Sequence, residues 1–132
     1  MIKDLWDIAQ GLIGLKSSFN QAKRDRKDRI SEYFESIGNI IQDTADSFKN
    51  DEVPHGKCQQ LLDQAQYFTD VVGDTIDHEK AEEFKAKLIQ SHEVELLASE
   101  ILGQANQSEK IVELEKTAAS FLSLAIALKA SQ

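Results

Sequence analysis

The sequence predicts an all-α protein, a mostly antiparallel four- to five-helix bundle with a long N-terminal helix or helical arm. Apolar residues recur at spacings of three and four along most of the chain, which is the period of one helical face. Six glycines and one proline in 132 residues are too few for the turns of a sheet with many short strands. We therefore expect residues 1–132 to form a single all-helical domain, with an amphipathic arm over residues 1–20 and a bundle over 21–132.

The first helix is open to two interpretations. Its apolar residues continue in phase into the clearest helical stripe of the chain, Ile30 to Phe48, so one unbroken helix from about Ile2 to Lys49 is possible. However, Lys23 and Arg26 interrupt the stripe, and Ser17 to Asn20 provide weak chemistry for stopping or starting a helix. The alternative is a break near these polar residues.

The middle of the chain predicts two further helices. Pro54 fits the first turn of a helix, and a single apolar stripe then runs from Cys58 to Ile76. After a turn at Gly73 to Asp77, a helix is expected from about His78 to Gly103. Its apolar face rotates by about 120° around Ser91 to Glu93, which predicts either a kink or a change of neighbours.

The last helix begins after a connection at Gly103 to Ser108, where Asn106 or Ser108 can serve as the N-cap. Its apolar residues cover more than half of the circumference. A helix that is apolar on most sides is usually buried on most sides, and we expect this for the last helix.

Composition and charge exclude several classes of function. The net charge of -8 opposes binding to nucleic acid. One cysteine allows neither an internal disulfide framework nor a four-cysteine metal site, and the absence of a signal-type apolar region near residue 1 predicts a reduced, cytoplasmic protein. The longest apolar stretch, Ala118 to Leu128, is about 11 residues, whereas a membrane-spanning helix needs about 18.

Chemically reactive residues are few. His55 and Cys58 lie near the start of a helix, where the helix dipole lowers the pKa of a thiol, so a cysteine nucleophile is conceivable. Cys58 is also in register with the apolar stripe that follows it, and we favour a packing role. The single Glu-x-x-His pair is split by Pro54, so no metal is expected. We expect neither a cofactor nor an enzymatic activity.

The N-terminal arm predicts a contact surface. Its wide apolar face includes the only tryptophan, and a basic cluster from Lys23 to Arg29 follows it. This is the arrangement of a helix that lies in a membrane interface. The alternative, which we favour, is that the face packs on the bundle or on a second copy of the protein. The candidate interface or membrane residues are Leu5, Trp6, Ile8, Leu12, Ile13, Phe19, Lys23, Arg24, Arg26, Lys27 and Arg29.

Two segments resemble a known family. The helix Ile30-x-x-Tyr33-Phe34-x-x-Ile37 and the helix start Pro54-His55-Gly56-Lys57-Cys58 are similar to an uncharacterised family of small bacterial helical proteins and N-terminal helical modules. The resemblance implies an adaptor or localisation role and assigns no functional residue. We expect a non-enzymatic protein that acts by protein–protein contact, as a homo-oligomer formed through its N-terminal arm. Peripheral membrane association is the alternative, and an enzyme that uses His55 and Cys58 is the third.

Overall fold

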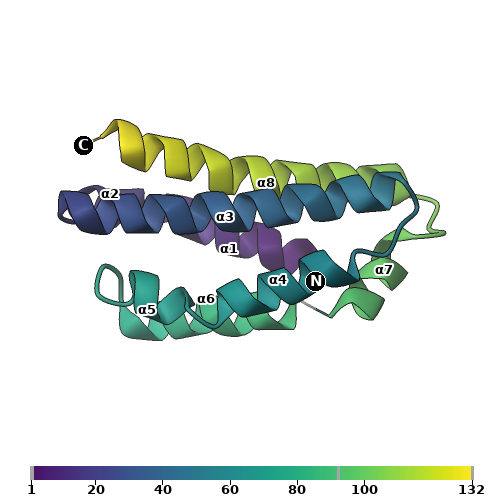
Figure 1. Ribbon diagram of the computed structural model, residues 1–132, viewed down its shortest axis with the longest axis horizontal. Coiled ribbons are helices and arrows are strands. Elements are labelled where there is room, and N and C mark those ends of the chain that lie inside the picture. Colours follow the sequence, from purple (N-terminus) through teal and green to yellow (C-terminus); the bar gives the residue numbers. More distant parts are fainter. Residues whose placement is uncertain (1, 92, 132) are drawn as a thin grey trace.

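The computed structural model describes residues 2–91 and 93–131, and in these ranges the chain forms helices and turns without any strand (Figure 1). This confirms the predicted all-α class. The helices of the described ranges are α1 (Ile2–Gly14), α2 (Lys16–Asn20), α3 (Arg24–Lys49), α4 (His55–Ala65), α5 (Phe68–Val72), α6 (His78–Gln90), α7 (Val94–Ile101) and α8 (Gln107–Ala130).

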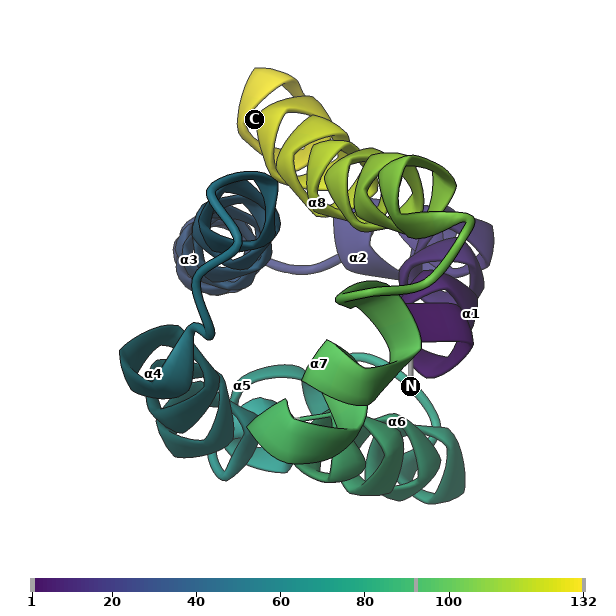
Figure 2. The same ribbon diagram turned by 90° about the vertical axis from the view of Figure 1, so that its right-hand side faces the viewer.

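Five of these helices form a closed ring, which Figure 2 shows end-on. Around the ring, α8 contacts α3, α3 contacts α4, α4 contacts α6, α6 contacts α1, and α1 contacts α8. Neighbours in a ring of five rods cannot all be antiparallel, because an odd number of directions cannot alternate around a circle. The parallel pair is α1 and α8, which both run from right to left in Figure 1.

The N-terminal region breaks twice. Helix α1 ends at Gly14, α2 is a short helix of five residues, and α3 begins at Arg24 and runs back in the opposite direction. Lys23 has an extended backbone with ψ of 152°, which ends the helical path just before α3. The predicted break is therefore observed, and the alternative of one helix from Ile2 to Lys49 is wrong.

Aromatic side chains fill the centre of the five-helix bundle. All six phenylalanines are buried. The ring of Phe34 on α3 lies 5.4 Å from that of Phe19 and 6.2 Å from that of Phe121, measured between centroids. The ring of Phe68 on α5 lies 6.2 Å from that of Phe84 on α6. These contacts join α2, α3 and α8 on one side of the core and α5 and α6 on the other, and Tyr33 links the two sides.

Helix α1 is one wall of this core and not a projecting arm. Its buried residues are Ile2, Leu5, Ile8, Ala9 and Leu12. Gly11, which the helical wheel places among charged residues, faces α6: a Cβ atom at this position would lie 2.6 Å from the ring of Phe84. The absence of a side chain at Gly11 therefore allows α6 to pack against a side of α1 that looks polar in the sequence.

Helices α3 and α8 pack closely at Gly38. A Cβ atom at Gly38 would lie 2.9 Å from Cγ of Leu122 and 3.2 Å from the carbonyl oxygen of Ala118. Nearby, the buried hydroxyl of Ser31 donates a hydrogen bond of 2.7 Å to the carbonyl oxygen of Ala125. This seam holds α8 against α3 along its length.

Three other expectations are changed by the structure. The single helix expected from Cys58 to Ile76 is divided at Gln66 and Tyr67 into α4 and α5. The helix expected from His78 to Gly103 is divided into α6 and α7 where its apolar face rotates. The broad burial expected for α8 is wrong. Because α3 and α1 cover only two of its sides, Val112 remains 44% exposed and Ile126 remains 69% exposed.

Candidate protein-binding surface

The apolar side chains expected at an interface lie in two different places. Leu5, Ile8, Leu12 and Phe19 are at most 1% exposed, because they pack in the core of the same chain. The predicted face of the arm is therefore covered within the monomer. At the edge of this buried face, Trp6 and Ile13 are each 38% exposed and remain available to a partner.

The basic cluster from Lys23 to Arg29 is partly used inside the fold. Arg26 forms an ion pair of 3.2 Å with Asp74. Lys27 is buried, and its Nζ donates a hydrogen bond of 3.2 Å to the backbone oxygen of Ser131 at the end of α8. The cluster lies beyond α2, whereas Trp6 is in the first half of α1. The exposed basic residues of the cluster are Lys23, Arg24 and Arg29.

The pair considered for nucleophilic chemistry is not arranged for it. Cys58 is 3% exposed and packs in the core, whereas His55 is exposed at the start of α4. Burial raises the pKa of the Cys58 thiol from its ordinary 9.0 to about 11, so the thiol is protonated at neutral pH. Among the described residues, no group of three or more His, Cys, Asp or Glu side chains is placed to hold a metal ion.

The buried thiol predicts a pH dependence of stability. Because the pKa of Cys58 is higher in the folded chain, folding is disfavoured once the unfolded thiol ionises, and the free energy of unfolding should fall as the pH rises from about 9 to 11. Burial also raises the pKa of Tyr33, which acts in the same direction above pH 10. Urea unfolding at several pH values measures this slope. In the variant Cys58→Ala, the free energy of unfolding should fall less steeply with pH than in the wild type. Equal slopes would contradict the raised pKa of the buried Cys58 thiol.

The exposed large apolar side chains are concentrated on two neighbouring helices. Of the seven large apolar residues exposed in the described part of the chain, four lie on the neighbouring parallel helices α1 and α8. Single exposed apolar residues are normal on protein surfaces, whereas a cluster of them is typical of an interaction site. We call this surface the α1/α8 face. Its exposed apolar and small residues are Trp6, Ile13, Val112, Ala119, Ser123 and Ile126.

A groove crosses the first half of this face. A depression of about 550 Å³ lies between α1, α7 and α8, and it is lined by Ile2, Lys3, Trp6, Glu100, Lys110, Glu113 and Lys116. A second depression, of about 350 Å³, is lined by Ser108, Glu109, Val112, Glu113 and Lys116. The two depressions adjoin at Glu113 and Lys116, which line both of them, and we call the pair the groove.

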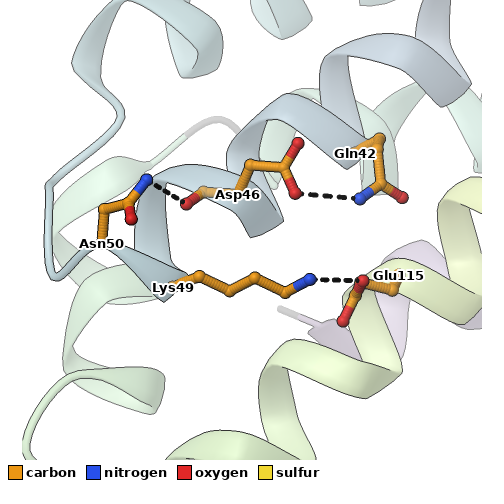
Figure 3. Close-up of polar contacts among 5 residues, drawn as sticks. All are labelled: Gln42, Asp46, Lys49, Asn50 and Glu115. Carbon is orange, nitrogen blue, oxygen red and sulfur yellow. Dashed lines mark hydrogen bonds and ion pairs between the residues drawn. The ribbon is translucent and has the colours of Figure 1, made fainter.

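The lysines of the groove differ from those on the other side of α8. Lys49 crosses from α3 to α8 and forms an ion pair of 2.8 Å with Glu115, and its neighbour Asn50 bonds to the backbone of Asp46 (Figure 3). The hydrogen bond to Glu115 raises the pKa of Lys49. Within the described part of the chain, by contrast, the ammonium groups of the groove form no ion pair or hydrogen bond. These groups belong to Lys3, Lys110 and Lys116.

Of the six residues of this face, the sequence predicts the two on α1, Trp6 and Ile13. It does not predict the residues on α8, because the wide apolar coverage of that helix favours burial. The heptad spacing of Val112, Ala119 and Ile126 was the available signal. No helix in the described ranges is long and apolar enough to cross a bilayer.

Comparisons with protein-family models, with curated proteins and with solved structures find no match for this chain. The similarity of the segments 30–37 and 54–58 to a family of small bacterial helical proteins therefore stays a prediction.

Proposed function

We propose that this chain is a non-enzymatic binding module that acts by protein–protein contact through the α1/α8 face. The observation that carries the proposal is the concentration of exposed apolar side chains on two adjacent helices, with a groove between them whose lysines have no ionic partner within the described residues. Interfaces of this kind combine apolar and aromatic anchors with a charged rim. The module needs neither a cofactor nor a metal for this activity.

The same structure favours a protein partner over membrane insertion of α1. Insertion would have to withdraw the apolar side of α1 from the core, including Leu5, Ile8 and Leu12. Each large apolar side chain contributes about 1.5–3 kcal/mol when it is buried. The summed contribution of these α1 side chains is comparable with the whole free energy of unfolding of a typical domain, about 5–15 kcal/mol. Binding through the exposed side of α1 has no such cost.

Site-specific photo-crosslinking tests the proposal. Ile126 is replaced with a photo-crosslinking phenylalanine derivative, because its side chain is 69% exposed on the α1/α8 face. Tyr67, which is 58% exposed between α4 and α5, receives the same derivative as the matched control. The chains are irradiated in the cells that produce them, and adducts are identified by mass spectrometry.

The proposal predicts one predominant protein adduct at position 126 that is absent at position 67. The additional variant Val112→Glu should reduce the yield of this adduct, because Val112 is exposed two heptads before Ile126 on the same side of α8. Equal adducts at both positions, or none at position 126, would show that the α1/α8 face is not a protein-binding surface.

A further inference from the structure

We propose that the depression of about 550 Å³ beside Trp6, which we call the Trp6 recess, binds a small aromatic phosphate. This ligand is a second occupant, separate from the protein partner proposed above, and its binding does not depend on that partner. The volume of the recess lies within the usual range of sites for small ligands, about 300–1,000 Å³. Residues of α1, α7 and α8 line it, so the site requires the folded chain.

The part of the recess that α1 forms includes an aromatic and an aliphatic side chain. Ile2 is 1% exposed, whereas Trp6 is 38% exposed and presents part of its indole to the recess. An indole suits a second flat ring, because aromatic rings pack favourably when they are offset-stacked or edge to face. The ring of a ligand would also cover apolar surface that is otherwise in contact with water.

The recess is also lined by three lysines, which are Lys3, Lys110 and Lys116. Their ammonium groups form no ion pair or hydrogen bond with the described residues. Two carboxylates line the recess as well. Glu100 accepts a hydrogen bond of 3.3 Å from the backbone N–H of Ile2, and Glu113 is exposed. Three positive and two negative groups give the recess a local charge of +1, although the whole chain carries -8.

Other described surfaces are less suited to an anion. Lys49, Lys57 and Lys129 each form an ion pair with a carboxylate on a neighbouring helix. Another depression, of about 640 Å³ between α3 and α4, is lined by four carboxylate side chains and by no lysine or arginine. An anion is repelled there, whereas the Trp6 recess attracts it.

The kind of cation in the recess favours phosphate over carboxylate. The described lining residues offer separate ammonium groups and no guanidinium. A lysine binds an anion as a point charge, without the paired geometry that matches arginine to a carboxylate. A phosphate monoester carries a charge of about -1.5 to -2 at pH 7 and three acceptor oxygens, so it can meet several ammonium groups at once. A carboxylate has a single charge to share among them.

The fluorescence of Trp6 tests the proposal, because Trp6 is the only tryptophan and lines the recess. The full chain is titrated with phenyl phosphate at low ionic strength, where exposed charges are least screened. The emission should change saturably, with a dissociation constant of about 1 mM or lower. Benzoate and benzyl alcohol carry the same ring with one charge or none, and each should bind at least about threefold more weakly. Inorganic phosphate, which lacks the ring, should displace phenyl phosphate only at severalfold higher concentrations.

Two substitutions on α8 should change the affinity for phenyl phosphate in opposite directions. Lys116→Gln should raise the dissociation constant about two- to fivefold, because one exposed charge pair is lost. Glu113→Gln should lower it by a similar factor, because it removes a carboxylate that repels the phosphate. Lys16→Gln removes the same charge as Lys116→Gln from an exposed position on α2, outside the recess, and should bind like the wild type. Circular dichroism should show the same helix content in all variants.

Three results would overturn the proposal. The first is an emission of Trp6 that shows no saturable change up to about 10 mM phenyl phosphate. The second is equal affinity of Lys116→Gln and the wild type, which would place the ligand outside the recess. The third is benzyl alcohol that binds as tightly as phenyl phosphate, which would make the recess a purely apolar site. Crosslinking at position 126 tests the proposed function separately, so either proposal can fail alone.

Discussion

Replacement of Phe34 with alanine should lower the free energy of unfolding by about 3–5 kcal/mol, which is the usual effect of removing a buried phenylalanine. Phe34 is fully buried on α3, and its ring contacts those of Phe19, Tyr33 and Phe121. Removal of the ring would leave a cavity at the point where α2, α3 and α8 meet. Urea unfolding, followed by circular dichroism, measures the difference between variant and wild type.

The matched control for this change is Tyr67→Ala, because Tyr67 is also aromatic but is 58% exposed. Its replacement should alter the free energy of unfolding by no more than about 0.5 kcal/mol. A loss below about 1 kcal/mol for Phe34→Ala would contradict the central position of this ring, because a buried phenylalanine costs more than that to remove.

An aspartate placed at Ile8 should unfold the protein or cost at least about 3–5 kcal/mol, which is the effect of leaving an unpaired charge in a protein interior. Ile8 is fully buried on the side of α1 that faces the core. The carboxylate introduced by Ile8→Asp would meet neither water nor a cation there, so α1 would have to leave the bundle or the core would have to open. Circular dichroism and urea unfolding detect either result.

The variant Ile13→Asp is the control, because it makes the same change on the same helix at a side chain that is 38% exposed. It should retain a stability close to that of the wild type, with a change of about 0.5 kcal/mol or less. If Ile8→Asp were tolerated as well as Ile13→Asp, the buried side of α1 would be assigned wrongly, and the N-terminal segment would be free to meet a membrane or a partner.

The fold class could be predicted from the sequence because each helix has an apolar face of its own. The stripe from Ile30 to Phe48 lies almost entirely within α3, and the rotated face near Ser91 marks the end of α6. Periodicity identifies which side of a helix is apolar, but not what covers that side. For this reason the sequence left open whether residues 1–20 pack within the chain or against another surface.

Two features of the packing have physical reasons that a single sequence does not contain. Gly11 appears polar by its neighbours on the helical wheel, yet its missing side chain admits the ring of Phe84. Helix α8 appears suited to complete burial, yet the ring of five helices gives it only two adjacent helices in the ring, α1 and α3. The exposed remainder of its apolar surface, with Val112 and Ile126, is the part of the candidate site that the sequence did not predict.

The candidate site was predictable only in part. Trp6 and Ile13 were identified because they belong to an amphipathic segment, whereas the groove depends on the placement of Lys110 and Lys116 beside α1. That placement follows from the parallel arrangement of α1 and α8, which is a property of the closed ring and not of either helix. Local patterns cannot pair helices as far apart in the sequence as Ile2–Gly14 and Gln107–Ala130.

The central claim is that α1 is an integral wall of the bundle, which leaves only its outer side, with Trp6, for contact with a partner. Amide hydrogen exchange tests this most directly, because it measures the free energy of opening for each helix. The amides of Ile8, Ala9 and Leu12 should exchange with the same opening free energy as those in the middle of α3. Rapid exchange of these α1 amides, while α3 remains protected, would contradict the claim and show that the N-terminal segment detaches as an arm.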